Sequence, residues 1–245
     1  MAYLKSLRIN WEQVEDKNTY PFNVPALAKC QTLDFNQNVT FFIGENGSGK
    51  STLLEAIAYQ CGFGVGGGDR NYDIGLSDES LSLASILTLA WMPKINKGFF
   101  LRAETFFDFA QFLDERAKDP FSGGGMVYNT FGGKSLNEQS HGEAFLSLFT
   151  NRFGGKSIFL LDEPEAALSP QRQLAFLRIM HDLEKEGAQF IIATHSPILM
   201  AYPGARIYEF DEDGINPIDY ETTDHYRLTK SFLSNPERYF RELFD

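Results

Sequence analysis

The feature that most constrains this chain is residues 40–52, Thr-Phe-Phe-Ile-Gly-Glu-Asn-Gly-Ser-Gly-Lys-Ser-Thr, which fit the pattern G-x-x-x-x-G-K-S in full. An apolar strand pattern precedes the glycines and a helical pattern follows them. Gly44, Gly47 and Gly49 allow a tight turn in which several backbone N–H groups face one hollow, and the start of the helix adds its positive end. Such a hollow binds polyphosphate.

Two side chains at the start of the expected helix have the chemistry that a bound nucleotide needs. Lys50 supplies a positive charge for the terminal phosphates. Ser51 places a hydroxyl where a magnesium ion that bridges two phosphates requires an oxygen ligand. The segment therefore predicts a phosphate loop of a nucleotide-binding fold.

A second motif supplies the other half of a nucleotide site. Residues 157–161 predict a short buried strand, which ends in Asp162 and Glu163. Neighbouring side chains of an extended strand point in different directions, so we expect Asp162 to face the magnesium at Ser51 and Glu163 to face the attacking water. Glu163 is the candidate general base, a role that needs orientation more than an extreme pKa.

His195 follows directly after another apolar strand pattern, residues 190–193. The carboxyl ends of parallel strands meet at one edge of a sheet, so His195 is expected beside Asp162, where it could sense the γ-phosphate. A histidine after a strand is more often structural when it stands alone. The presence of the phosphate loop and of the paired carboxylates favours the functional interpretation.

Residues 140–143, Ser-His-Gly-Glu, precede an apolar helical pattern and have two interpretations. They fit a capping box, in which Ser140 caps the helix and Glu143 reaches back to its start, and this interpretation needs no ligand. A capped helix start that contains the small residue Gly142 is also an anion site. Both interpretations stay open at this stage.

Composition limits the possible partners. A net charge of −11 and a pI near 4.9 disfavour a broad nucleic-acid surface, although they leave room for a local basic patch. Cys30 and Cys61 lack metal-ligand spacing and the N-terminus lacks an apolar signal core, which favours a reducing cytoplasm. No apolar run is long enough to span a membrane, so we expect no direct membrane insertion.

The remaining patterns predict an α/β organisation with the helix of a βαβ unit between the strands that carry Asp162 and His195. The periodicity of residues 80–91 fits a helix and a strand equally. The other expected elements are strands at residues 3–9 and before the phosphate loop, forming a sheet edge; a loop at 62–68; an apolar run at 98–103; helices at 105–118, from 140 and at 171–185; a connection at 119–133; a hairpin at 206–220; and a helix that begins at Pro236.

The order of these motifs between Gly44 and His195 resembles the ABC-type ATPase domain, and more specifically the small soluble predicted ATPases of the AAA family that are related to the heads of structural-maintenance-of-chromosomes proteins. The resemblance implies an α/β P-loop fold of the ABC-head type, with a central parallel sheet, an antiparallel β edge and a helical subdomain. It further implies one ATPase domain over residues 1–245, with a helical signature subdomain at approximately 105–152.

The resemblance also implies a cofactor set of ATP and Mg²⁺ and an ATP-dependent homodimer, in which Ser140 and Gly142 of one copy contact the nucleotide of the other. Glu163 and His195 are implied to be catalytic, and Ser51 and Asp162 to hold the metal. Glu104 stands near the place of the usual Q-loop glutamine and is a further candidate for the metal, against an ordinary surface acid. The residues expected to bind nucleotide within one copy are Gly44, Glu45, Asn46, Gly47, Ser48, Gly49, Lys50, Ser51 and Thr52.

Several positions depart from the transporter pattern. Gln139 and His141 stand where Leu and Gly are usual in the signature, and Ser169 stands in place of the D-loop aspartate. Arg70 resembles an arginine near the phosphates of chromosome-type heads but is more often a solvated side chain. Tyr20 or Phe22 could stack on adenine, although loop aromatics more often pack in the core.

These observations favour a soluble magnesium-dependent ATP hydrolase that pairs on binding ATP, opens on hydrolysis and acts on an unidentified protein partner. One alternative is the ATP-binding subunit of a membrane transporter, and another is a DNA repair or defence ATPase. A switch that only binds nucleotide is disfavoured, because such a site has no need of Glu163.

Overall fold

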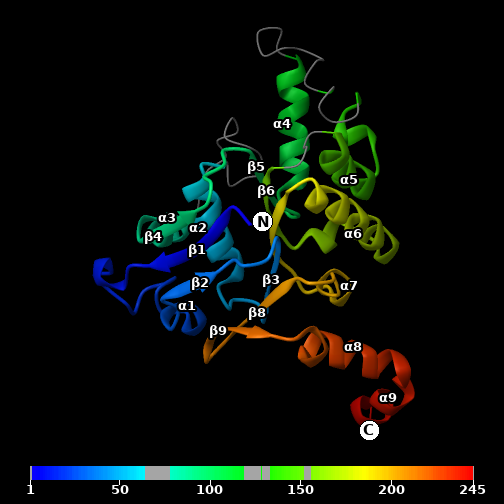
Figure 1. The fold of residues 1–245 in the computed structure, drawn as a ribbon. Coiled ribbons are helices and arrows are strands. Elements are labelled where there is room, and N and C mark those ends of the chain that lie inside the picture. The colour runs from blue at the N-terminus through cyan, green and yellow to red at the C-terminus, as the bar shows by residue number, and fades with distance from the viewer. Residues whose placement is uncertain (1, 64–77, 119–127, 129–132, 152–155, 245) are drawn as a thin grey trace.

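A six-stranded, mostly parallel sheet forms the centre of the molecule (Figure 1), as seen in a computed structural model that describes residues 2–63, 78–118, 128, 133–151 and 156–244. The strand order is β5-β6-β7-β3-β8-β9, and β9 alone runs antiparallel to its neighbour. In chain order these strands are β3 (Val39–Gly44), β5 (Gly98–Arg102), β6 (Ile158–Asp162), β7 (Gln189–Ala193), β8 (Arg206–Asp211) and β9 (Gly214–Ile218).

The central strands are buried on both faces, which explains their nearly continuous apolar sequences. Alternate residues enter two separate cores, because successive side chains of a strand point to opposite faces. Phe41 and Ile43 pack into one core and Phe42, between them, packs into the other. The sheet therefore needs a cover of other elements on each side.

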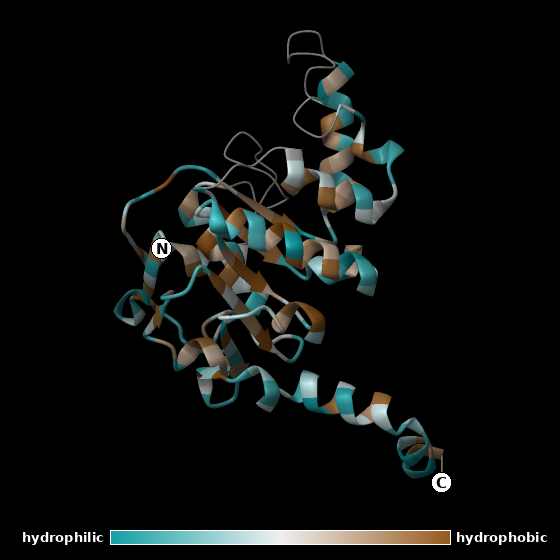
Figure 2. Cartoon of the chain, turned by 45° about the vertical axis from the view of Figure 1, so that its right-hand side comes forward, coloured by the Kyte–Doolittle hydropathy of each residue, from teal (hydrophilic) through white to brown (hydrophobic). Residues whose placement is uncertain are grey.

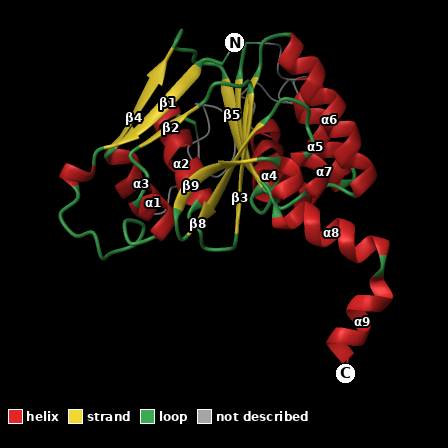
Figure 3. Ribbon diagram, turned by 60° about the horizontal axis from the view of Figure 1, so that its bottom comes forward, coloured by secondary structure: helices red, strands yellow, loops and turns green. Residues whose placement is uncertain are grey.

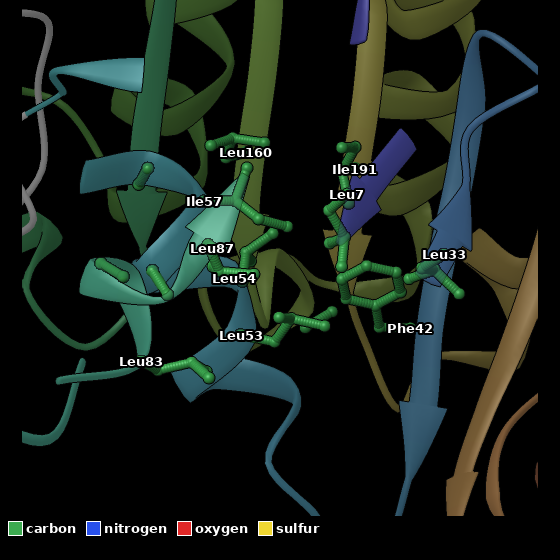
Figure 4. Close-up of a cluster of buried hydrophobic side chains, with 14 of the residues drawn as sticks. Leu7, Leu33, Phe42, Leu53, Leu54, Ile57, Leu83, Leu87, Leu160 and Ile191 are labelled. Atoms are coloured by element: carbon green, nitrogen blue, oxygen red, sulfur yellow. The ribbon is translucent and has the colours of Figure 1, made fainter. Parts of the chain in front are cut away.

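One face is covered by helix α2 (Lys50–Cys61) and by a second, antiparallel sheet. This three-stranded sheet has the order β2-β1-β4, with β1 at Leu4–Ile9, β2 at Thr32–Asp34 and β4 at Leu87–Trp91. In Figure 4, Leu53, Leu54 and Ile57 of α2 belong to one cluster with Leu160 of the central sheet and Leu87 of the smaller sheet. The N-terminal strands thus form a sheet of their own beside the central one.

The other face is covered by helices that include α4 (Phe106–Lys118), α5 (His141–Asn151) and α6 (Pro170–Lys185) (Figure 3). Their shared core is rich in phenylalanine, and Phe145 contacts both Phe149 and Phe176 at ring-centroid distances of 5.3 and 5.6 Å. The remaining helices are α1 (Pro25–Ala28), α3 (Asp78–Ser85), α7 (Pro197–Met200), α8 (Asp224–Ser234) and α9 (Pro236–Phe244), and short 3-10 turns lie at Trp11–Gln13, Leu136–Glu138, Pro164–Ala167 and Tyr220–Thr222.

The predicted fold class is confirmed, and two local expectations change. The ambiguous segment 80–91 holds both elements, since α3 ends at Ser85 and β4 begins at Leu87. The expected sheet edge before the phosphate loop is instead part of the separate antiparallel sheet. The glycine-rich loop after residue 63, with Arg70, and most of the connection at 119–133 lie outside the described residues.

The C-terminal part leaves the body of the domain. The expected β8–β9 hairpin is present, but Asp211 pairs with Gly214, so its two-residue loop is Glu212–Asp213 and Gly214 already belongs to β9. Asn235 Oδ1 accepts a hydrogen bond from Arg238 N at 3.3 Å, as expected for a helix cap. Helices α8 and α9 then extend outward as an arm whose polar faces are visible in Figure 2. Within the described ranges, every helix is too short or too polar to cross a bilayer.

Candidate functional site

The predicted site residues converge because they follow adjacent parallel strands. In the order β5-β6-β7-β3, the carboxyl ends of the strands lead to Glu104, to the Asp162–Glu163 pair, to His195 and to the phosphate loop. The register is continuous, since Asp162 lies beside Ala193 and Ala193 lies beside Phe42. Ligand sites of open α/β sheets form at this edge.

The phosphate loop has the backbone that its glycines predict. Gly44, Gly47 and Gly49 have φ values of 138°, 80° and 93°, which favour glycine. At Gly44 a Cβ atom would also lie 2.4 Å from the carbonyl oxygen of Phe210, so the close approach of β8 excludes any side chain. The hydroxyl of Ser48 in the same loop is buried and has no hydrogen-bond partner among the described residues, so it is free to contact a ligand.

Lys50 is folded back on its own loop. Its Nζ donates hydrogen bonds to the carbonyl oxygens of Gly44, at 2.7 Å, and of Glu45, at 2.9 Å. Burial lowers the pKa of Lys50, whereas the nearby carboxylates of Glu163 and Asp162 oppose this shift. A phosphate group is the natural partner for this buried cation, because its oxygens offer more negative charge than two carbonyls.

Ser51 and Asp162 meet as the sequence predicts. Ser51 Oγ donates to Asp162 Oδ1 at 3.0 Å, which brings two oxygen donors suited to magnesium together. The other oxygen of Asp162 accepts from Arg102 Nε at 3.0 Å, and the same guanidinium pairs with Glu55. Burial raises the pKa of Asp162, while Arg102 and Ser51 oppose the shift.

Arg102 and Glu55 were not singled out from the sequence. Arg102 lies directly beside Asp162 in the β5–β6 register, and Glu55 lies on the buried side of α2. The available signal was one charged residue at the end of an apolar strand and one acid within an apolar helix face, and such residues are almost never fully buried unless they are paired. Only the tertiary structure, in which Arg102 pairs with Glu55, shows that the two belong to one cluster.

A pocket of about 140 Å³ lies between these groups, lined by Ser51, Arg102, Glu104, Asp162 and Glu163. Liquid water occupies about 30 Å³ per molecule, so this volume suits a hydrated cation. No group of three or more metal-binding side chains occurs in the part of the chain that the structure describes. Magnesium is usually held by one or two carboxylates together with phosphate oxygens and water, and the pocket offers the Asp162 carboxylate and the Ser51 hydroxyl. Glu104 is exposed at this pocket, and its role as a ligand stays a prediction.

Glu163 takes a conformation that the sequence analysis did not anticipate. It has φ 49° and ψ 50°, so β6 ends at Asp162 and strand alternation is not what separates the two carboxylates. The left-handed backbone instead turns the Glu163 side chain, whose Oε1 lies 3.6 Å from His195 Nε2. Burial, and then the charge of Asp162, raise the pKa of Glu163, which makes it a better proton acceptor.

Comparisons with known proteins agree with this geometry. One AAA-domain family model matches residues 18–98, which contain the phosphate loop, and a second, described as "AAA domain, putative AbiEii toxin, Type IV TA system", matches residues 144–201, which contain Asp162 and His195. Over these two stretches the chain is similar to AAA-class ATPase domains.

Two curated relatives carry ABC-type names. A putative ABC transporter ATP-binding protein of Methanothermobacter marburgensis is 26% identical over 80% of the chain and 74% of that protein. A ribose import ATP-binding protein of Bacillus cereus is 26% identical over 70% of the chain, but the match spans only 37% of that relative. A solved structure, a putative metal-chelate type ABC transporter in an inward-facing conformation, matches with a TM-score of 0.52 and 14% identity over 94% of this chain and 88% of that one.

Within the site, His195 is held by two residues that sequence reasoning missed. Its backbone N–H donates to Glu165 Oε1 at 2.5 Å, and its Nδ1 lies 3.1 Å from Nε2 of His225. Its Nε2 is buried and, among the described residues, has no hydrogen-bond partner. Burial lowers the pKa of His195, and the nearby charge of Lys50 acts in the same direction. Nothing in the local sequence connects His195 with a residue 30 positions later.

The Ser140–Glu143 motif forms a modified capping box at the start of α5. Glu143 Oε2 accepts from Ser140 N at 3.2 Å, as predicted, but the Ser140 hydroxyl donates to the same carboxylate at 2.6 Å. Arg172 of α6 binds both residues and lies against Gly142, where a Cβ atom would approach its Nη1 to 2.3 Å. Among the residues described, no hydrogen bond or ion pair joins this motif to the phosphate loop of the same chain, so its role in nucleotide binding stays a prediction.

The two candidates for adenine stacking have different environments. Phe22 packs edge-on against Trp11, with ring centroids 6.2 Å apart, and contributes to the core. Tyr20 is 50% exposed, and its hydroxyl lies 2.6 Å from the hydroxyl of Thr52 at the start of α2. Tyr20 therefore stays a candidate for a nucleotide contact, whereas Phe22 has a structural explanation.

Proposed function

We propose that this ATPase domain hydrolyses ATP with Mg²⁺. The observation that carries the proposal is the placement, at one sheet edge, of the Ser51–Asp162 pair at 3.0 Å and the Glu163–His195 pair at 3.6 Å beside a phosphate loop. The first pair supplies metal ligands, and the second supplies a base and a hydrogen-bond donor. Together they provide what phosphoryl transfer to water requires.

Each residue has a defined task in this proposal. The loop amides and Lys50 bind phosphate oxygens, and Ser51 and Asp162 hold the metal, with Glu104 as a further candidate beside the same pocket. When bound, magnesium supplies positive charge that offsets the negative charge on the phosphates. Glu163 orients the attacking water and accepts its proton, a task that its raised pKa favours.

The matched pair Glu163→Gln and Glu115→Gln tests this assignment. Glu163→Gln keeps the shape of the side chain but removes the base, so phosphate release from Mg-ATP should fall by about 100-fold or more. Equilibrium binding of ATP should persist. Glu115 is exposed on α4, and its replacement should change neither quantity. Unchanged phosphate release by Glu163→Gln would refute the assignment of the base.

We further propose that two copies pair around ATP, with residues 105–152 as a helical signature subdomain within a single domain. Ser140 is exposed at the start of α5, where a second copy can reach it. The Glu163→Gln protein should change from monomer to dimer in light scattering when Mg-ATP is added. A constant mass while ATP is bound would refute pairing of the isolated chain.

The physiological partner is proposed to be a protein in the cytoplasm. Cys30 is buried, and burial raises its pKa to about 11, which keeps it as a thiol. Free thiols fit a reducing compartment. The charge of −11 disfavours nucleic acid as a partner.

A transporter subunit is the second candidate, favoured by the names of the two curated relatives. In that case the domain would couple ATP hydrolysis to a separate membrane protein. Recovery of a membrane subunit on purification of the tagged chain from detergent-solubilised membranes would support this reading. A defence ATPase is a third candidate, favoured by the description of the second family model. Stimulation of hydrolysis by DNA at physiological salt would support a nucleic-acid role.

A further inference from the structure

A second histidine contacts the ring of His195 from outside the motifs that define the site. His225 is the second residue of α8, whose start is capped by the buried Thr223, which accepts from Tyr226 N at 3.3 Å. Nε2 of His225 lies 3.1 Å from Nδ1 of His195, and the ring centroids are 5.3 Å apart. The distance is that of an N–H···N hydrogen bond.

The other contacts of His195 fix the position of its ring. Glu165 holds the backbone N–H, so the ring lies between Glu163 on one side and His225 on the other. Burial lowers the pKa of both histidines, so both rings are neutral at mildly alkaline pH. The charged groups that act on the pair are Lys50, Glu45 and Asp224, in addition to Glu163.

A neutral imidazole carries one N–H, so the bridge between the rings requires one donor and one acceptor. If His195 Nδ1 were the donor, its Nε2 lone pair would face the Glu163 carboxylate at 3.6 Å, and Nδ1 of His225 would hold a buried N–H without an acceptor among the described residues. If His225 Nε2 is the donor, His195 carries its proton on Nε2, toward the carboxylate. The second arrangement directs an N–H, rather than a lone pair, at the carboxylate, and it leaves no proton on the buried Nδ1 of His225.

We propose that His225 is a positioning residue of the site, which donates its Nε2–H to His195 Nδ1 and thereby holds His195 as the Nε2–H tautomer. In this form His195 presents a hydrogen-bond donor on the side of Glu163, where a phosphate oxygen requires one. A preorganised donor of this kind contributes to catalysis because it needs no rearrangement during the reaction. The catalytic consequence rests on the proposed ATP hydrolysis, whereas the tautomer does not.

Through His225, the C-terminal arm of helices α8 and α9 is connected to the site. His225 and Asp224 line a pocket of about 550 Å³ that residues of the phosphate loop, including Glu45 and Ser48, also line. A displacement of the first turn of α8 would therefore remove the donor from His195 without moving the phosphate loop. The arm is thus placed to influence the site through one hydrogen bond.

The matched variants His225→Gln and His225→Glu test the proposal, because they have the same shape and differ in whether the terminal group can donate. The chain has four histidines, so the ring nitrogens of nucleotide-free, ¹⁵N-histidine-labelled protein can be assigned by loss of signals in His195→Gln and His225→Gln. Long-range ¹H–¹⁵N correlation at pH 8 should show His195 protonated on Nε2 in the natural protein and in His225→Gln. In His225→Glu the proton should reside on Nδ1, bound to the new carboxylate.

Kinetics provide the second readout. His225→Glu should lower kcat by about 100-fold, the loss that removal of one preorganised donor causes, with little change in KM, while His225→Gln stays close to the natural protein. A natural protein with His195 protonated on Nδ1, or a His225→Glu variant with unchanged tautomer and kcat, would overturn the proposal. Absence of ATP hydrolysis in the natural protein would refute the proposed function instead, because the NMR result is obtained without nucleotide.

Discussion

Among the described residues, Arg102 is the only cation that forms ion pairs with both Glu55 and Asp162, the two buried carboxylates next to the proposed metal site. Replacement of Arg102 therefore tests the electrostatics of the site most directly. The side chains of Glu55 and Asp162 are 6% and 4% exposed, and Arg102 pairs with each of them. In Arg102→Met the apolar part of the side chain is kept and the charge is lost. The two buried carboxylates then lose the guanidinium that pairs with both of them.

The expected cost follows from this burial. Removal of one partner from a buried ion pair costs about 3–5 kcal/mol, because the remaining charge stays desolvated and uncompensated. The side chain of Arg102 is itself 27% exposed, and solvent screening reduces its contribution. We therefore expect the free energy of unfolding to fall by about 2–4 kcal/mol, which for a chain of this length lowers Tm by roughly 4–16 °C.

Urea unfolding at several pH values measures the effect and checks its cause. Burial already raises the pKa of Asp162, so the folded protein binds that proton more tightly than the unfolded chain does. This carboxylate therefore lowers stability at neutral pH, and the loss is relieved as pH falls through its folded-state pKa. Because loss of Arg102 raises that pKa further, the free energy of unfolding that Arg102→Met loses relative to the natural protein should become smaller as pH falls from neutral through the folded-state pKa of Asp162.

The control is Arg178→Met, which removes an exposed pair with Asp182 on α6 and should leave unfolding unchanged. If Arg102→Met lowered the free energy of unfolding by less than about 1 kcal/mol, the carboxylates of Glu55 and Asp162 would be solvated rather than buried. If the loss in the free energy of unfolding became larger as pH fell, the interaction that Arg102→Met removes would not be the neutralisation of carboxylates. Either result would refute the reasoning.

Three further predictions concern the nucleotide site. Lys50→Ala should weaken ATP binding by about 1.5–3 kcal/mol, roughly ten- to a hundred-fold in Kd, and unchanged affinity in calorimetric titration would exclude the loop as the site. Gly44→Ala should lower the free energy of unfolding by about 2–6 kcal/mol in urea unfolding, because φ is 138° and the new Cβ meets a backbone oxygen of β8. Gly47→Ala is the control: a Cβ atom there meets open space, so the loss should be only about 1–2 kcal/mol. Ser140→Arg should leave ATP binding unchanged but prevent ATP-dependent pairing in light scattering, whereas Thr150→Arg, on the exposed side of the same helix, should still pair. Pairing of Ser140→Arg would contradict the role of Ser140 across the dimer.

Local sequence was sufficient for the elements whose chemistry lies within a few neighbouring residues. The phosphate loop, the strand that ends in Asp162 and the helix after Ser140 all follow from turn chemistry and hydrophobic periodicity, and the structure contains them. The meeting of Ser51 with Asp162 was also predictable, because parallel strands that alternate with helices bring their carboxyl ends to one edge.

Periodicity failed where two elements share a short segment. Residues 80–91 hold the end of α3 and the whole of β4, so no single period describes them. Strand alternation likewise could not describe Glu163, because its left-handed backbone directs the side chain after the strand has ended. The change from helix to strand between Ser85 and Leu87, and the direction of the Glu163 side chain, both depend on local backbone conformation, which periodicity does not report.

The partners of the predicted residues were decided by tertiary structure alone. Arg102 reaches Asp162 through the β5–β6 register, and His225 reaches His195 because α8 begins beside the phosphate loop. These contacts join residues 60 and 30 positions apart. The sequence names the groups that could perform the chemistry because motif spacing is local, whereas burial, tautomer and charge balance depend on which distant elements pack together.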